Sequence, residues 1–87
     1  MEIETHLLTD AAEIIDGKSE THGDPERNFG TIANYWTDYL GVHVDKSDVA
    51  EMMIRLKLAR SETGEFNEDD YRDLISYANF AANFQNE

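Results

Sequence analysis

The sequence predicts an all-α protein, a small four-helix bundle formed by a single helical domain over residues 1–87. Three observations lead to this prediction. Apolar residues recur at intervals of three and four, which is the period of a helix that buries one face. Start signals (Asp, Asn and Pro) and stop signals (Gly) separate four such segments. The brief alternation of apolar and polar residues at 41–45 is too short for a strand and lies between helices.

The first two predicted helices cover residues 2–16 and 24–40, and a glycine follows each as a C-terminal stop. The second helix has the stronger start signal. Asp24 accepts hydrogen bonds from free backbone N–H groups of the first turn, and Pro25 suits the first helical position. The apolar stripe of this helix consists of Phe29, Ile32, Ala33, Trp36 and Leu40.

The last two predicted helices cover residues 47–60 and 67–84. The third is apolar on most sides, with a main face of Val49, Met52, Met53 and Leu56, and this predicts a central position. The fourth begins at Asn67 as the N-cap and has two apolar faces. The first face is Tyr71, Leu74, Ile75, Ala78, Ala81 and Ala82, and the second is Tyr77, Phe80 and Phe84. Four short helices cannot cover so much apolar surface, so we expect a homodimer or higher homo-oligomer.

The net charge of −12 limits the classes of function. It argues against direct binding of nucleic acid, because each phosphate contact needs local positive charge. It fits a solvated acidic surface, adaptation to high salt, or mimicry of nucleic acid toward a basic groove of another protein. No apolar run is long enough for a membrane span, and the absence of cysteine favours a reducing cytoplasm. The negative charge makes a protein with a basic surface the expected partner, and a nucleotide is the alternative.

Residues 48–60 form the only stretch in which bases outnumber acids. Lys57 lies between two leucines, so its ammonium is partly desolvated and needs a carboxylate partner or an anionic ligand. Arg60 shares a helix face with it. This pair predicts either ion pairs with carboxylates of the last helix or a cationic patch that binds a phosphate. Arg55 has Glu51 four residues before it and is expected to form a surface ion pair.

Two further sets of residues are candidates for chemistry. Asp70 and Asp73 share a helix face and are candidate Mg²⁺ ligands, although acids in a first turn also stabilise the helix dipole. His22 and Asn28 flank the start of the second predicted helix, where backbone N–H groups attract anions, and are candidate phosphate-binding residues. No nucleophile motif or zinc spacing is present, so no catalytic residue is assigned and no cofactor is expected unless Mg²⁺ binds.

Three segments together resemble a known family. They are His22–Phe29, Asp48–Arg60 and Asp69–Ala78, with the patterns HGDPxxNF, DVAxMMxxLKxAR and DxxxDxxxYA. This order is similar to a family of small proteins encoded largely by phages and prophages and catalogued as a domain of unknown function. The resemblance spans roughly residues 6–84. It implies an all-α fold and a phage setting, hence the cytoplasm of a host cell, and it supplies no activity.

The helical architecture is also similar to the MazG-type all-α nucleoside-triphosphate pyrophosphohydrolases, which hold Mg²⁺ between acidic pairs of neighbouring helices. Asp70 and Asp73 match one such pair, whereas helix 47–60 offers Glu51 alone. The leading hypothesis is therefore a small acidic phage-type binding protein that inhibits or sequesters a component of host defence or of the nucleic-acid machinery. The alternative is a Mg²⁺-dependent pyrophosphohydrolase of the MazG type.

Overall fold

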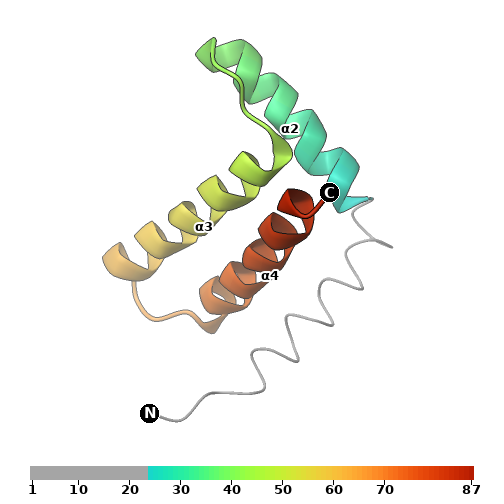
Figure 1. Ribbon diagram of the computed structural model, residues 1–87. Coiled ribbons are helices and arrows are strands. Elements are labelled where there is room, and N and C mark those ends of the chain that lie inside the picture. The colour runs from blue at the N-terminus through green and yellow to red at the C-terminus, as the bar shows by residue number, and fades with distance from the viewer. Residues whose placement is uncertain (1–23) are drawn as a thin grey trace.

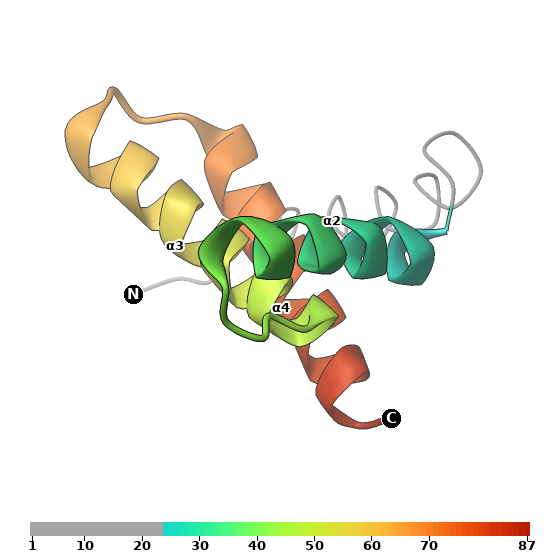
Figure 2. The same cartoon turned by 90° about the horizontal axis from the view of Figure 1, so that it is seen from above.

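The computed structural model describes residues 24–87, which form three α-helices and contain no strand. The helices are α2 (Pro25–Leu40), α3 (Lys46–Thr63) and α4 (Glu68–Gln85). Helices α3 and α4 form an antiparallel hairpin, and α2 crosses one end of it (Figures 1 and 2). The predicted all-α fold is confirmed for these residues. The predicted helix at 2–16 lies outside them.

Side-chain caps fix the predicted starts of two helices. Asp24 accepts a hydrogen bond from the backbone N–H of Glu26 at 3.1 Å, and Pro25 follows it as the first residue of α2. Asn67 accepts from the backbone N–H of Asp69 at 3.0 Å at the start of α4. Each cap satisfies a backbone donor that has no partner within its helix. Both starts were predicted correctly because this chemistry is local.

Helix α3 is longer than the predicted 47–60 at both ends. It begins one residue earlier because Asp45 and Asp48 form a capping box. The N–H of Asp48 donates to Asp45 Oδ1 at 2.8 Å, and the N–H of Asp45 donates to Asp48 Oδ2 at 3.0 Å. It ends three residues later because nothing breaks the helix before Gly64, whose N–H still donates to the Arg60 carbonyl at 3.0 Å.

The hydroxyl of Thr37 closes the turn between α2 and α3. Thr37 Oγ1 donates to the carbonyl of Val44 at 3.0 Å and accepts from the N–H of Val44 at 2.8 Å. Gly41 ends α2 with φ of 72°, a left-handed conformation that glycine adopts without strain. Together these features set the direction in which the chain leaves α2 and enters α3.

The core lies where α2 meets the hairpin. The ring of Phe29 packs 5.4 Å from that of Phe80, 5.5 Å from that of Phe84 and 6.0 Å from that of Tyr77, measured between centroids. Small side chains let the three helices approach one another around these rings. The buried core consists of Phe29, Ala33, Val44, Val49, Ala50, Phe80 and Ala81.

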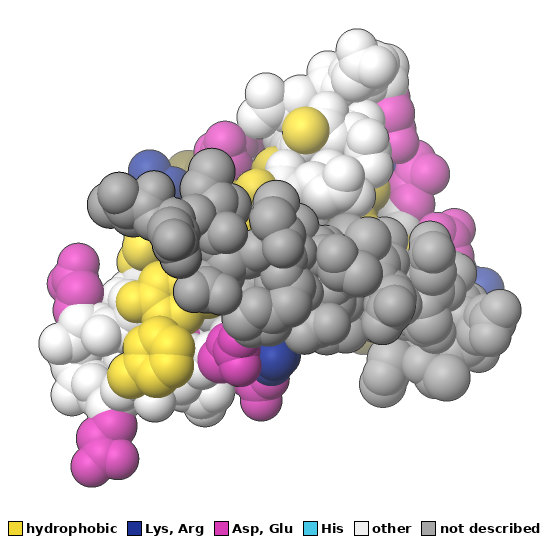
Figure 3. Space-filling model, turned by 90° about the horizontal axis from the view of Figure 1, so that it is seen from below, with side chains coloured by type: hydrophobic (Ala, Val, Ile, Leu, Met, Phe, Trp, Pro, Cys, Tyr) yellow, Lys and Arg dark blue, Asp and Glu magenta, His cyan; other side chains and the backbone are white. Residues whose placement is uncertain are grey.

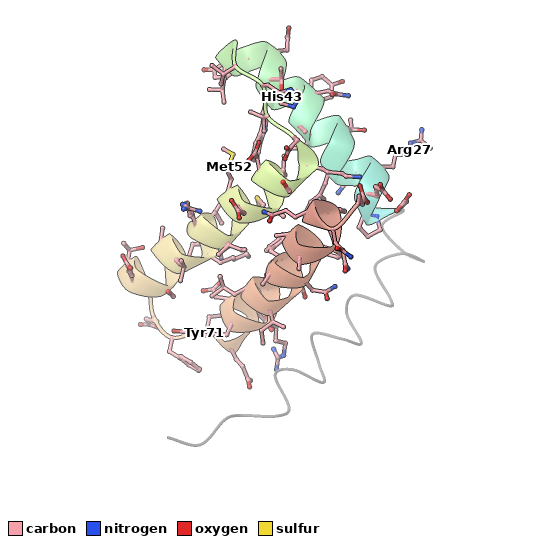
Figure 4. The ribbon with its side chains drawn as sticks, in the orientation of Figure 1. Arg27, His43, Met52 and Tyr71 are labelled. Atoms are coloured by element: carbon pink, nitrogen blue, oxygen red, sulfur yellow. The ribbon has the colours of Figure 1, made fainter. Side chains whose placement is uncertain are left out.

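The predicted main face of α3 is partly wrong. Met52 and Leu56 are exposed, whereas Ala50 and Lys57 are buried beside Val49. Figure 4 shows Met52 on the side of α3 that points away from α4. The face of α3 toward α4 therefore includes a charged residue and excludes two large apolar ones. The most hydrophobic face of α3 is not the face that packs against α4.

Of the two predicted faces of α4, the second lies in the core, together with Ala81 of the first. The rings of Phe80, Phe84 and Tyr77 pack around Phe29, whereas Tyr71, Ala78 and Ala82 of the first predicted face are exposed. Where α2 crosses the hairpin, the aromatic rings of α4 are long enough to reach Phe29, and alanine side chains are not.

Candidate functional site

Four charged side chains meet across the hairpin near the loop that joins α3 to α4. We call Lys57, Arg60, Asp70 and Asp73 the ion-pair cluster. Lys57 is 8% exposed, and its Nζ lies 2.8 Å from Asp73 Oδ2. Asp70 is 4% exposed, and its Oδ1 lies 3.7 Å from Arg60 Nε. The antiparallel register thus places each basic residue of the pattern on α3 opposite an acidic residue of α4.

The residues beside the cluster complete a polar layer that borders the aromatic core. Tyr77 follows Asp73 by one turn of α4, and burial, then the charge of Asp73, raise its pKa, with Lys57 acting in the opposite direction. Its phenol therefore stays neutral at physiological pH. Ser76 is completely buried, and its Oγ donates to the carbonyl of Arg72 at 3.1 Å, which satisfies the hydroxyl within its own helix.

The sequence allowed a carboxylate or an anionic ligand as the partner of Lys57. In the structure Lys57 lies within ion-pair distance of a carboxylate, that of Asp73. The predicted surface pair of Arg55 is wrong. Within residues 24–87 no ion pair joins Arg55 to Glu51, and Glu51 accepts a hydrogen bond from Gln85 at 3.4 Å at the end of α4.

The alternative hypothesis requires Mg²⁺, and the described donors do not fit it. Asp70 and Asp73 lie on one face of α4 as predicted, but each lies close to a cation of α3. Among residues 24–87 no group of three or more His, Cys, Asp or Glu side chains is arranged to hold a metal. Mg²⁺ prefers several oxygen ligands, so these two carboxylates alone are an incomplete set.

The two remaining candidates are not brought to the cluster. Asn28 lies exposed in the first turn of α2, whose neighbour Phe29 packs on Phe84 near the end of α4. The cluster lies near the start of α4, at the other end of that helix (Figure 1). His22 lies outside the described residues. Within the described part of the chain, Asn28 and the cations of α3 therefore form no common site.

Sequence reasoning missed a second charged contact, at Lys46. This residue starts α3, forms ion pairs with Glu26 of α2 and with Glu87, and lies 5.2 Å from the centroid of the Phe84 ring. Its hydrogen bonds to the two carboxylates raise its pKa, and the bond from Lys46 is the main cause of the lowered pKa of Glu26. A signal existed, because a lysine at a helix start opposes the helix dipole and needs a compensating anion.

The surface of the described residues is strongly acidic. Residues 24–87 hold 13 Asp and Glu side chains against 6 Lys and Arg. Four of these six bases already pair with acids of the same chain: Lys46, Lys57, Arg60 and Arg72. Seen from below, Figure 3 shows carboxylate side chains around the periphery of the described surface. None of the described helices is long and apolar enough to cross a membrane.

This fold and this site define a small all-α protein in which a helical hairpin, joined by ion pairs across the helices, carries an acidic surface. The chain belongs to the family described as Domain of unknown function (DUF6378), whose family model matches residues 6–85. The predicted resemblance to a small phage-encoded family of unknown function is thereby confirmed.

Two phage proteins are similar to the chain. The Gene 55 protein of Mycobacterium phage L5 is 40% identical over 74 residues, which cover 83% of this chain and 47% of that protein. The Gene 55 protein of Mycobacterium phage D29 is 33% identical over 73 residues, which cover 83% of this chain and 48% of that protein. The chain thus spans about half the length of these curated relatives. No solved structure matches it.

Proposed function

We propose that this protein is a phage-type binding protein, without catalytic activity, that binds a basic surface of a protein in the cytoplasm of the host cell and thereby inhibits or sequesters it. One observation carries the proposal. Most of the basic side chains of the described helices are neutralised by acids of the same chain, whereas acids in excess remain on the surface. Such a surface attracts cationic partners and repels anionic ones.

The ion-pair cluster supports a protein partner over a nucleotide. A phosphate that approached Lys57 would have to displace or lie beside Asp73, which is 2.8 Å away, and the buried Asp70 adds a second negative charge nearby. Removing one member of a buried pair leaves the other without compensation, which is costly. The cations of α3 are therefore better suited to joining the helices than to holding an anion.

The loop between α3 and α4 supplies the contacts that we expect the partner to use. Glu62 at the end of α3 and Glu65 in the loop are exposed. Phe66 is 80% exposed, and its ring stacks on that of Tyr71 in α4, with 5.8 Å between the centroids. Lysine and arginine bind carboxylates and also lie over aromatic rings. We call residues 62–71, which are this loop with the adjoining end of α3 and start of α4, the acidic loop. A basic protein surface is the partner that uses both of its features.

The test is affinity capture with the full chain, followed by measured binding of the captured protein at low and physiological salt and with double-stranded DNA as a competitor. We expect binding to weaken steeply with salt and DNA to displace the protein. The triple substitution Glu62→Gln, Glu65→Gln and Phe66→Ala should weaken binding at least tenfold. Asp38→Asn, which removes an exposed charge of α2, is the matched control. Affinity that does not depend on salt would contradict the mimicry of nucleic acid.

The nucleotide hypothesis is tested by thermal unfolding with nucleotides, each with and without Mg²⁺. A nucleotide at about 100 times its dissociation constant adds ~2.7 kcal/mol of stability, which is a visible shift for a domain of this size. Stabilisation without Mg²⁺ would replace our proposal by sequestration of a nucleotide at Lys57 and Arg60. Stabilisation that requires Mg²⁺, with release of pyrophosphate that is lost in Asp73→Ala, would instead establish the MazG-type alternative.

Two structural predictions belong to this proposal. We infer that a fourth helix over residues 2–16 completes the bundle, and that the protein works as a homodimer or higher oligomer. The second inference is supported by exposed apolar side chains at several places among the described residues, which are Tyr35, Tyr39, Leu40, Val42, Met52, Leu56, Leu58, Phe66 and Tyr71. Exposed apolar surface of this extent is typical of interaction sites.

A further inference from the structure

The side of α2 opposite the core combines exposed aromatic rings with almost no charge. Thr31, Asn34, Tyr35, Asp38 and Tyr39 form this side, which we call the outer face of α2. Tyr35 is 72% exposed and Tyr39 is 88% exposed. The first four residues also line a shallow depression of about 380 Å³.

Charge distinguishes this face from the rest of the described surface. Residues 28–44 contain a single charged side chain, Asp38, whereas the other 18 charged side chains of residues 24–87 lie outside this segment. Two molecules of charge −12 repel each other, and the repulsion is weakest where the facing surfaces carry the fewest charges. A basic partner binds the acidic surfaces. The outer face of α2 therefore remains available to a partner that is itself negatively charged.

We propose that two copies of the chain pair through the outer face of α2, as an antiparallel helix pair about a two-fold axis. This proposal extends the proposed oligomer by naming its surface, and it does not depend on the identity of the basic partner. An isologous contact requires a surface that is complementary to itself. The outer face of α2 has this property. Tyrosine hydroxyl groups, which donate, alternate along the helix with Asn34 and Asp38, which accept.

The pairing follows from the sequence positions. If the axis passes between Tyr35 and Asp38, Tyr35 of one copy faces Asp38 of the second copy, and Tyr39 faces Asn34 of the second copy. Each phenol then has an acceptor, a carboxylate in one case and an amide carbonyl in the other. Both tyrosine rings cover apolar surface while their hydroxyl groups stay hydrogen-bonded, which is a common use of tyrosine at interfaces.

The contact area is sufficient for a dimer of modest affinity. Tyrosine buries about 200 Å² in a full contact, so the exposed parts of the two rings contribute roughly 300 Å² per copy. The symmetric contribution of the second copy and the flanking polar side chains bring the total close to the ~1,000 Å² of the smallest specific interfaces. We therefore expect dissociation in the micromolar range.

Sedimentation equilibrium of the full chain tests the proposal. We expect a dimer at about 100 µM, where a pair with a dissociation constant of about 10 µM is mostly formed. Tyr39→Ala and Tyr35→Ala should each weaken the dimer at least tenfold. Phe66→Ala is the matched control, because this ring is equally exposed but lies in the acidic loop. A monomer at this concentration, or equal effects of all three substitutions, would overturn the proposal.

Salt separates this proposal from the proposed function. Added salt screens the repulsion between two acidic molecules and should strengthen the dimer, whereas it should weaken binding to a basic partner.

A second experiment is chemical cross-linking, which is possible because the chain has no native cysteine. Asp38→Cys should give dimers linked by a short bismaleimide, and Glu62→Cys should not. Linkage of both variants alike would show that the face is not specific. Loss of dimerisation would leave binding of the basic partner intact, and the converse also holds.

Discussion

The two ends of the α3–α4 hairpin are held together in different ways. At the end crossed by α2, the rings of Phe29, Phe80 and Phe84 pack against one another. At the loop end, Lys57 and Asp73 occupy the corresponding positions between the same two helices. The apolar stem of a lysine packs like a hydrophobic side chain while its ammonium reaches a carboxylate at the margin. A pair of helices can thus be joined near solvent by residues that tolerate incomplete burial.

The difference also concerns specificity. Contacts between rings are weakly directional, so many registers of the two helices would bury similar apolar area. The ion pairs are selective, because a shift by one residue would remove Lys57 from Asp73 and leave a buried charge without its partner. We infer that the aromatic end supplies most of the stability of the hairpin and that the ion-pair cluster fixes its register.

The largest expected effect is at the aromatic end. Phe29→Ala removes a ring that contacts three others, and it should lower the free energy of unfolding by about 3–5 kcal/mol. Urea denaturation followed by circular dichroism measures the change. Phe66→Ala, at an exposed ring, should stay within about 0.5 kcal/mol of the native value. Equal costs at the two positions would contradict the division of roles.

The next effect is at the ion-pair cluster. Removing one partner of a fully buried pair costs about 3–5 kcal/mol, and because Asp73 is 28% exposed we expect about 2–3 kcal/mol for Lys57→Met. The double variant Lys57→Met with Asp73→Leu should recover most of this loss, since no charge is then left without a partner. A double-mutant cycle in urea measures the coupling. A harmless single substitution would mean that the pair does not fix the register.

The capping box of α3 lies at the end crossed by α2 and should contribute less than the aromatic core or the ion-pair cluster. Asp45→Ala removes the cap and should cost about 1 kcal/mol. The backbone N–H of Asp48, followed by the hydroxyl of Ser47, lowers the pKa of Asp45. The stabilisation by its carboxylate is therefore present above the ordinary aspartate pKa and is lost as the pH falls through the lowered value of the folded state.

The matched variant for this pH dependence is Asp45→Asn, because asparagine is also a good N-cap but does not titrate. Near pH 7 its stability should be close to that of the native protein. Below about pH 4 the native protein should become less stable than the variant, because the Asp45 carboxylate is protonated whereas the asparagine keeps its cap. Parallel pH profiles from thermal unfolding of the two proteins would contradict this role of Asp45.

The smallest effect is expected at the exposed member of the cluster. Arg60 lies 3.7 Å from Asp70 and is more than half exposed, so its charge is largely screened. Arg60→Gln keeps a hydrogen-bond donor for Asp70 and should cost less than about 1 kcal/mol. About 1 M salt should reduce this cost further but should leave the coupling of Lys57 to Asp73 nearly unchanged. Urea titrations at the two salt concentrations distinguish these cases.

Local chemistry made the starts of α2 and α4 predictable, whereas packing between helices decided which faces are buried. The caps at Asp24 and Asn67 depend on residues one or two positions away, and both were predicted. The buried face of α3 was not, because Lys57 is buried by its register with α4 while Met52 remains exposed. Hydrophobicity along a single helix contains no information about which carboxylate of another helix lies opposite.

The partner of Lys57 also depends on how the helices pack. The sequence limited the partner of Lys57 to a carboxylate or an anionic ligand, because a desolvated cation needs one of them. The choice required the distance between α3 and α4, which places Asp73 at 2.8 Å. The ion pairs of Lys46 with Glu26 and Glu87 join residues far apart in the sequence, and only the crossing of α2 over the hairpin brings them together.

The hydroxyl of Thr37 has a consequence for how the chain tolerates change. Because one oxygen both donates to and accepts from Val44, the turn between α2 and α3 has a fixed length. Serine at this position would keep both hydrogen bonds, and valine would keep neither. The loop after Gly64 has no such clasp among the described contacts. Extra residues in that loop should therefore lower the stability of the fold less than extra residues in the turn closed by Thr37.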